Sequence, residues 1–264
     1  MEQYSNRIFL RRKADGSVLL AGMILIYCMA AVVTRFRLED GIASFGNAVI
    51  WITKSLRITP EAMRLFPKVM NKLCETALLS VAVTVIASIF AFIASVFGSR
   101  ATGLHGSVNR LVRALAALFR NVPDVVWAMI LLFSFGQNIL TGFFALFFTT
   151  FGMLTRAFIE TMDEVSADCV EALHAAGAGF MQTVFQGILP SMITSIITWV
   201  FYMIETNIRS STLIGILTAT GIGYLLDLYY KRLDFAVVSL IVAATIGMVI
   251  AIEIISNTVR KVIG

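Results

Sequence analysis

Long apolar runs separated by polar stretches set the pattern of this chain of 264 residues. A membrane-crossing α-helix needs roughly 20 predominantly apolar residues. Six runs reach or approach that length: Val18–Thr34, Leu73–Phe97, Leu111–Phe135, Thr141–Phe158, Ser191–Leu217 and Phe235–Ser256. The pattern therefore predicts an all-α membrane protein with about six transmembrane helices. An even number of crossings places both ends of the chain on the same side.

The composition agrees with a membrane environment. Hydrophobic residues make up 58% of the chain, charged residues make up 14%, and the mean hydropathy is +0.87. A monomeric soluble domain cannot expose this much apolar surface to water. The net charge of +5 is dispersed and forms no basic stripe, so a nucleic-acid partner is not expected.

The charges beside the first span predict the orientation. Four cations precede it, namely Arg7, Arg11, Arg12 and Lys13. Positive charges before a first span favour a cytoplasmic N-terminus. The apolar run is long and lacks a small-residue cleavage site, which favours an uncleaved helix over a signal peptide. We therefore expect a multi-pass membrane protein with both termini in the cytoplasm.

The loop between the first two spans is predicted to contain a helix. Apolar clusters at Phe45–Ile52 and Ala62–Phe66 lie among its charges, as in an interfacial amphipathic helix. Residues 1–71 are thus expected to form an N-terminal tail, the first helix and this loop. Residues 72–264 are expected to form the membrane core.

The connection from Ile159 to Pro190 is unusually long for a membrane protein, and long connections usually have a function. Glu171 to Ala176 are strong helix formers, and Gly177 supplies a stop. The sequence predicts a short helix outside the bilayer, on the cytoplasmic side where ATP is found. The acidic residues of this connection are expected to be its solvated face or a contact for a cationic partner; they are Glu160, Asp163, Glu164 and Asp168.

This connection resembles the coupling loop of binding-protein-dependent ABC importer permeases. The loop pattern is Glu-Ala-Ala, three residues, Gly, nine residues, Ile, one residue, Leu-Pro. The matching positions are Glu171, Ala172, Gly177, Leu189 and Pro190. Leu173 replaces the second Ala, and Gly187 replaces Ile. The resemblance implies the type I ABC importer permease (MetI-like) fold, with residues 159–190 as the coupling loop, and a location in the bacterial cytoplasmic membrane.

The residues that would couple to an ATPase fit that role physically. They are Glu171, Ala172, Leu173, His174, Ala175, Ala176 and Gly177. The small alanine side chains let the helix lie close in a partner groove, and Glu171 favours the positive N-terminal end of the helix. Pro190 would begin the next membrane helix, where its missing N–H costs nothing. The alternative is a surface loop with an ordinary capped helix.

A second resemblance is narrower. The segment Phe201–Gly223 looks like the signature of phosphonate-type permeases, and Arg120-Asn121-Val122-Pro123 resembles the third core helix of that family. The positions of Phe201–Gly223 that match this signature are Glu205, Asn207, Arg209, Ser210, Gly215, Gly221 and Gly223. The chain departs from the family at Thr218-Ala219-Thr220, and at Thr149, where His is common. The resemblance implies a substrate such as phosphonate, phosphite or a phosphate ester.

The polar residues of these spans have two open interpretations. Glu205 and Arg209 lie four residues apart, so they share a helix face and can pair. Charges at bilayer depth turn toward partners or water. The residues either form an internal polar clamp or line the translocation path, where Arg209 would contact an oxyanion. The full candidate set is Glu205, Asn207, Arg209, Ser210, Arg120 and Thr149. Pro123, Gly221 and Gly223 are candidates for a hinge or gate, or for simple kinking and packing.

Signals for enzymatic chemistry are nearly absent from the sequence. His105 and His174 lack metal-ligand companions, and no GxxxxGK[ST] loop is present. We expect no metal site and no cofactor on this chain, with ATP–Mg bound by a partner. The resemblance to ABC importer permeases implies three partners: an ABC ATPase dimer, a second copy of the permease and an extracytoplasmic binding protein. Two alternatives are an ion-coupled secondary transporter, with Glu205 or Glu253 as proton carrier, and a membrane-embedded enzyme.

Overall fold

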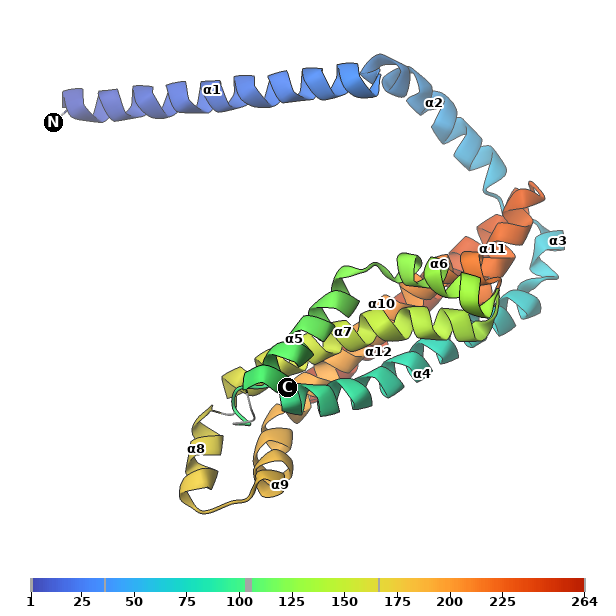
Figure 1. Ribbon diagram of the computed structural model, residues 1–264. Helices are drawn as coiled ribbons and strands as arrows, with labels where there is room; N and C mark the ends of the chain where they lie inside the picture. Colours follow the sequence, from blue (N-terminus) through green and yellow to red (C-terminus); the bar gives the residue numbers. More distant parts are fainter. Residues whose placement is uncertain (1, 36, 103–105, 166, 264) are drawn as a thin grey trace. The chain divides into compact units, whose positions relative to one another are not determined.

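The computed structural model describes residues 2–35, 37–102, 106–165 and 167–263 (Figure 1). These residues form helices and connecting turns and contain no strand. They include five helices that are long and apolar enough to cross a membrane, or six if one bent pair counts as a single span. The prediction of an all-α membrane protein with about six spans is confirmed.

The chain divides into two compact units, residues 1–56 and 57–264. The first unit contains α1 (Glu2–Thr34) and α2 (Leu38–Ser55). The first candidate span, Gly16–Thr34, is the apolar part of α1. Helix α2 includes the apolar cluster Phe45–Ile52, so this part of the predicted interfacial segment is helical.

Four long helices build the second unit: α4 (Phe66–Gly98), α7 (Ile139–Val165), α10 (Leu189–Thr218) and α12 (Phe235–Ile263). Helix α7 packs against α4 and α10 through a core that includes Val83, Ala91, Leu146 and Phe158. The short α3 (Pro60–Met63) is capped by Thr59, whose side chain accepts from the amide of Ala62. Figure 1 shows α4, α7 and α10 running alongside one another.

The third predicted span is broken. In place of one helix from Leu111 to Phe135, the chain forms α5 (Gly106–Asn121) and α6 (Asp124–Phe135), which meet at an angle of 90°. Pro123 has ψ 145 and an extended conformation, and it cannot donate a backbone hydrogen bond. Its carbonyl instead accepts from the amides of Val126 and Trp127, so α6 starts afresh. The third predicted span is therefore present as a bent pair of helices, with the break at Pro123, where a kink was expected.

Aromatic side chains hold the broken pair against α7. The Phe119 ring lies 5.2 Å from that of Phe148, and the Trp127 ring lies 4.9 Å from the same phenylalanine. Gly152 on α7 allows close approach, because a Cβ there would lie 2.6 Å from the backbone nitrogen of Arg120. Both helices of the bent pair are therefore packed against α7 in this conformation.

Helix α10 begins at Leu189 with Pro190 in its first turn, as predicted, but the helical run starts earlier. It is preceded by α9 (Phe180–Gln182) and by a π-helical turn, η1 (Thr183–Ile188). The amide of Leu189 bonds to the carbonyl of Val184, five residues back. Pro190 has no N–H to offer the preceding turn, and such a position favours a widened turn of this kind.

Helix α11 (Gly221–Lys231) follows a tight reversal at the end of α10. Ala219 adopts the left-handed conformation, with φ 55. Helix α11 then packs against α4 and α12 through Ile222, Leu225 and Tyr229.

Candidate coupling and translocation sites

The short cytoplasmic helix predicted near Glu171 is α8 (Ala167–Ala175). Gly177 has φ +80, and the amide of Ala178 donates to the carbonyl of Leu173 over 2.9 Å. This bond and the left-handed glycine form a Schellman-type helix end. The predicted helix and its glycine stop are confirmed, but α8 begins four residues earlier, and α7 continues to Val165.

Helix α8 has one anchored side and one open side. Val170 is buried with Met162 of α7 and with Val184 and Ile188 of η1. The candidate coupling residues Glu171, Ala172, Ala175, Ala176 and Gly177 are exposed. Leu173 is half-buried, and the side chain of His174 lies outside the described residues. The small residues at the end of α8 and directly after it are thus available to a partner.

The two departures from the coupling-loop pattern touch each other. A Cβ on Gly187 would overlap Cδ1 of Leu173 and would lie 3.4 Å from Sγ of Cys169. The larger side chain at position 173 therefore occupies the space left by the missing side chain at position 187. The departures form a complementary pair that holds α8 against η1.

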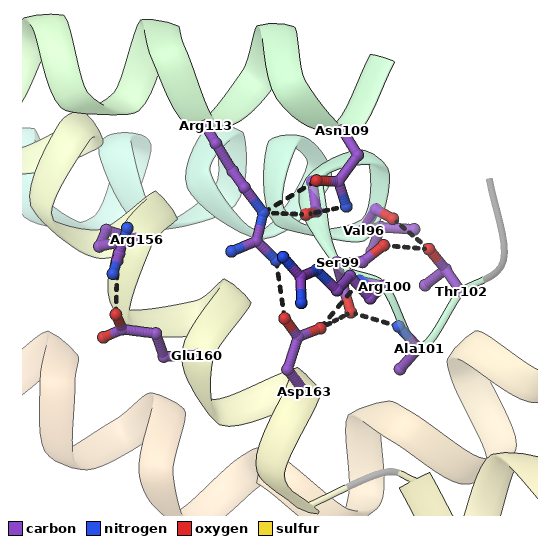
Figure 2. Close-up of polar contacts among 11 residues, drawn as sticks. Val96, Ser99, Arg100, Ala101, Thr102, Asn109, Arg113, Arg156, Glu160 and Asp163 are labelled. Atoms are coloured by element: carbon purple, nitrogen blue, oxygen red, sulfur yellow. Dashed lines mark hydrogen bonds and ion pairs between the residues drawn. The ribbon is translucent and has the colours of Figure 1, made fainter. Parts of the chain in front are cut away.

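Asp163 lies in the last turn of α7, shortly before α8 begins. Its carboxylate accepts hydrogen bonds from three donors (Figure 2). Its Oδ1 accepts from Ser99 Oγ over 2.6 Å and from the amide of Arg100 over 2.8 Å. Its Oδ2 accepts from Arg113 Nη2 over 2.7 Å. Asp163 therefore binds the corner between α4 and α5 and does not lie on a solvated face, which was one of the two places expected for it.

The corner itself is held by a second set of bonds from Arg113 and Asn109. Arg113 Nε donates to the carbonyl of Gly98 over 3.0 Å and to Oδ1 of Asn109 over 2.9 Å. The Asn109 amide also donates to the carbonyl of Gly98. A Cβ on Gly98 would lie 2.5 Å from Ile159 of α7. The glycine at this position lets the end of α4 lie close to α7 without displacing the Ile159 side chain.

The other acidic residues of the connection differ from Asp163. Glu160 pairs with Arg156 one turn away on α7, and both side chains are about half exposed, at 51% and 44%. Glu164 is exposed, and the side chain of Asp168 lies outside the described residues. The prediction that these acidic residues lie on a solvated face is confirmed for Glu160 and Glu164.

Asn207 joins three helices in the interior of the bundle. Its side-chain amide donates to Thr84 Oγ1 of α4 over 2.8 Å, and its Oδ1 accepts from Thr150 Oγ1 of α7 over 3.1 Å. All three residues are buried. A neighbouring bond from Ser80 to Ser211, 3.2 Å long, adds a second link between α4 and α10. For Asn207 the structure favours an internal polar clamp between helices over a place in the translocation path.

Glu205 and Arg209 form the pair expected from their spacing, with 3.0 Å between Oε1 and Nη2. Arg260 of α12 approaches the same carboxylate at 3.7 Å and also donates to Ser256 Oγ. The Glu205 side chain is 16% exposed, whereas that of Arg209 is 55% exposed. The carboxylate is thus anchored between α10 and α12, and the Arg209 guanidinium reaches outward.

The remaining candidates are dispersed. Arg120 is exposed at the end of α5, while Thr149 and Ser210 are half-buried. Within the described residues, no hydrogen bond or ion pair joins these three to the Glu205 group.

The glycines at the start of α11 permit close packing. A Cβ on Gly221, which has φ +57, would overlap Thr76 Oγ1, and a Cβ on Gly223 would overlap the carbonyl of Thr212. The Gly221 amide donates to Glu75 Oε1 over 3.2 Å. These contacts bind the start of α11 to α4 and α10.

A match to a known family decides what kind of protein this is. Residues 87–264 match the family described as binding-protein-dependent transport system inner membrane component. The chain belongs to this family. It is therefore a multi-pass permease component of an ABC importer, which removes the support for a secondary transporter or a membrane-embedded enzyme.

Relatives of the permease have names that refer to phosphorus oxyanions. The phosphite transport system permease protein PtxC of Stutzerimonas stutzeri is 31% identical over 189 residues, which cover 72% of this chain and 69% of that protein. The phosphate-import permease protein PhnE of Mycolicibacterium smegmatis is 28% identical over 187 residues, covering 71% of this chain. The permease spans only 35% of the length of that mycobacterial relative.

The fold of the permease is also found in a solved transporter. An inward-facing structure of the MetNI methionine ABC transporter aligns with a TM-score of 0.62 at 18% identity, over 74% of this chain and 97% of that chain. The predicted type I ABC importer permease fold, of the MetI-like kind, is confirmed.

The contacts of Asp163 were missed by sequence reasoning. Its partners Ser99 and Arg113 lie 64 and 50 positions away in the chain. The one local signal is the Gly98-Ser99 pair at the end of an apolar run, which marks a helix stop and says nothing of its partner.

Proposed function

We propose that this permease imports phosphonate or a related phosphorus oxyanion, such as phosphite or a phosphate ester. The observation that carries the proposal is the outward-reaching Arg209 guanidinium within the candidate span Phe180–Thr218. The names of the relatives support the same class of substrate.

Arg209 is suited to a weak, transient contact with an anion. A guanidinium at bilayer depth is unfavourable in lipid, so it faces water or protein in the assembled transporter. Glu205 accepts one of its hydrogen bonds and offsets part of its charge. The remaining donors can bind an oxyanion without a deep energy well, and this favours release. Arg120, Thr149 and Ser210 are proposed to line the same path.

The proposed assembly contains two copies of this permease, an ATPase dimer that binds ATP–Mg, and an extracytoplasmic binding protein. Each ATPase subunit contacts the open side of α8, from Glu171 to Gly177, on the cytoplasmic side. Both termini of the permease also lie in the cytoplasm. Closure of the ATPases displaces α8 and changes the side to which the path is open.

The same displacement requires elements that bend. Pro123, between α5 and α6, is proposed as a hinge because it has no N–H and so cannot donate the backbone hydrogen bond that would continue α5 into α6. Gly221 and Gly223 are proposed to form part of an outer gate at the start of α11.

Uptake by the complex purified through a tag on this chain, reconstituted in proteoliposomes, tests the function. We expect uptake of a phosphonate, phosphite or phosphate but not of sulfate, dependent on ATP and insensitive to a protonophore. Uptake that persists after inactivation of the ATPase would contradict the proposal.

Variants at position 209 test the role of the guanidinium. Arg209→Ala is expected to lower uptake more than Arg209→Lys, because lysine keeps the charge. If both variants assemble and transport like the unmodified protein, Arg209 does not contact the substrate.

A further inference from the structure

We propose that Asp163 is a positioning residue that makes the corner between α4 and α5 move together with the last turn of α7, which leads into α8. This inference rests on the proposed function, because it assigns the route by which displacement of α8 reaches the membrane helices. We call the set of residues that makes this connection the Asp163 tie: Gly98, Ser99, Arg100, Asn109, Arg113 and Asp163.

The tie connects three helices at one point. Asp163 is in the last turn of α7, Gly98 ends α4, and Asn109 and Arg113 lie in the first turns of α5. Figure 2 shows the carboxylate of Asp163 pointing toward Ser99 and Arg113. Because the carboxylate binds a side-chain hydroxyl, a backbone amide and a guanidinium, it resists displacement in more than one direction.

The environment of the tie distinguishes it from a surface ion pair. The side chains of Arg113 and Asp163 are only 23% and 26% exposed. Water and salt therefore screen their attraction less than that of an exposed pair. The neighbouring pair Arg156–Glu160 is about half exposed and links two positions of the same helix, so it cannot join α7 to anything else.

The tie is adjacent to α8 as well as to the membrane helices. A recess of about 460 Å³ is lined by Arg100, Ala101, Asp163, Val170 and Glu171. The lining of the recess thus includes residues of the tie, Arg100 and Asp163, and residues of α8, Val170 and Glu171. Val170 belongs to the same buried apolar cluster as Met162, which lies one residue before Asp163, and α8 is in contact with α7. A force on α8 therefore reaches the last turn of α7, and the tie passes it to α4 and α5.

The test compares Asp163→Asn with Glu160→Gln in the reconstituted complex. Asparagine keeps the shape of the side chain and an acceptor for Ser99 and Arg100, but it loses the charge and presents a donor to Arg113. The measured quantity is the amount of substrate imported per ATP hydrolysed, together with the recovery of the ATPase with the permease.

We expect Asp163→Asn to keep ATP hydrolysis and to lower this ratio roughly five- to tenfold, a typical size for coupling between sites. Glu160→Gln, which removes the same charge one turn earlier on the same helix, is expected to leave the ratio unchanged. An unchanged ratio in Asp163→Asn would overturn the proposal.

Two milder variants keep the test decisive if Asp163→Asn does not assemble. Ser99→Ala removes one of three donors, and Arg113→Lys keeps the charge but loses the forked contact with Gly98 and Asn109. Both are expected to lower the ratio, Arg113→Lys more strongly. Normal ratios in both would overturn the proposal. If the unmodified complex imports substrate without ATP, the proposed function fails instead, and the two failures are distinguishable.

Discussion

The contact between Leu173 and Gly187 allows a quantitative test of how α8 is held. Gly187→Ala adds a Cβ that would overlap Cδ1 of Leu173. Overpacking of this kind costs about 1–3 kcal/mol, whereas alanine recovers about 1 kcal/mol of helix propensity. The expected net loss of stability is therefore up to about 2 kcal/mol.

The partner substitution, Leu173→Ala, leaves a partly filled space. Full burial of a leucine makes this change cost about 2–5 kcal/mol, and the half-buried position of Leu173 reduces the expected cost to about 1–2 kcal/mol. In the double variant the overlap disappears and the new methyl group partly fills the space. The double variant should therefore be more stable than the sum of the single effects by about 1–2 kcal/mol.

Apparent unfolding temperatures in detergent provide the assay, since 1 kcal/mol corresponds to about 2–4 °C in chains of this size. Gly179→Ala is the matched control, because a Cβ there would meet only Gln182 Oε1, at 3.8 Å. Its effect should add to that of Leu173→Ala. The reasoning is refuted if Leu173→Ala and Gly187→Ala add within about 0.5 kcal/mol.

Three further predictions concern packing and backbone conformation. Gly177→Val should lower import per ATP, because φ +80 is unfavourable for a branched residue, while Gly177→Asn should be milder; equal import in both would exclude backbone strain as the cause. Asn207→Leu should cost about 1–3 kcal/mol, seen as a lower unfolding temperature, and an unchanged temperature would argue against the clamp. Gly223→Ala should reduce the yield of folded protein far more than Gly247→Ala, whose added Cβ meets open space, and similar yields would contradict the packing described at α11.

Features of the sequence that act locally predicted the structure well. Apolar runs of sufficient length became helices, because the backbone in a bilayer must satisfy its own hydrogen bonds. Gly177 ended α8 because few other residues accept its left-handed conformation. The pairing of Glu205 with Arg209 followed from helical spacing alone.

Features that depend on distant residues were not predictable in this way. Pro123 was predicted to be a hinge or a kink, but the 90° bend also depends on packing of Phe119 and Trp127 against α7. Asp163 was assigned to a solvated face because nothing near it in sequence reveals Ser99 or Arg113. The complementarity of Leu173 and Gly187 likewise required the three-dimensional contact.

The π-helical turn η1 changes the direction in which the residues before it present their side chains relative to those of α10. Its widened turn contains one residue more than an α-helical turn, so side chains before it are rotated by about 100° from the directions that an uninterrupted helix would give them. The direction in which Phe180 to Gln182 present their side chains is thus offset from the direction in which Arg209 projects. Deletion of a single residue within Thr183–Ile188 would cancel this offset and turn Phe180 to Gln182 relative to α10.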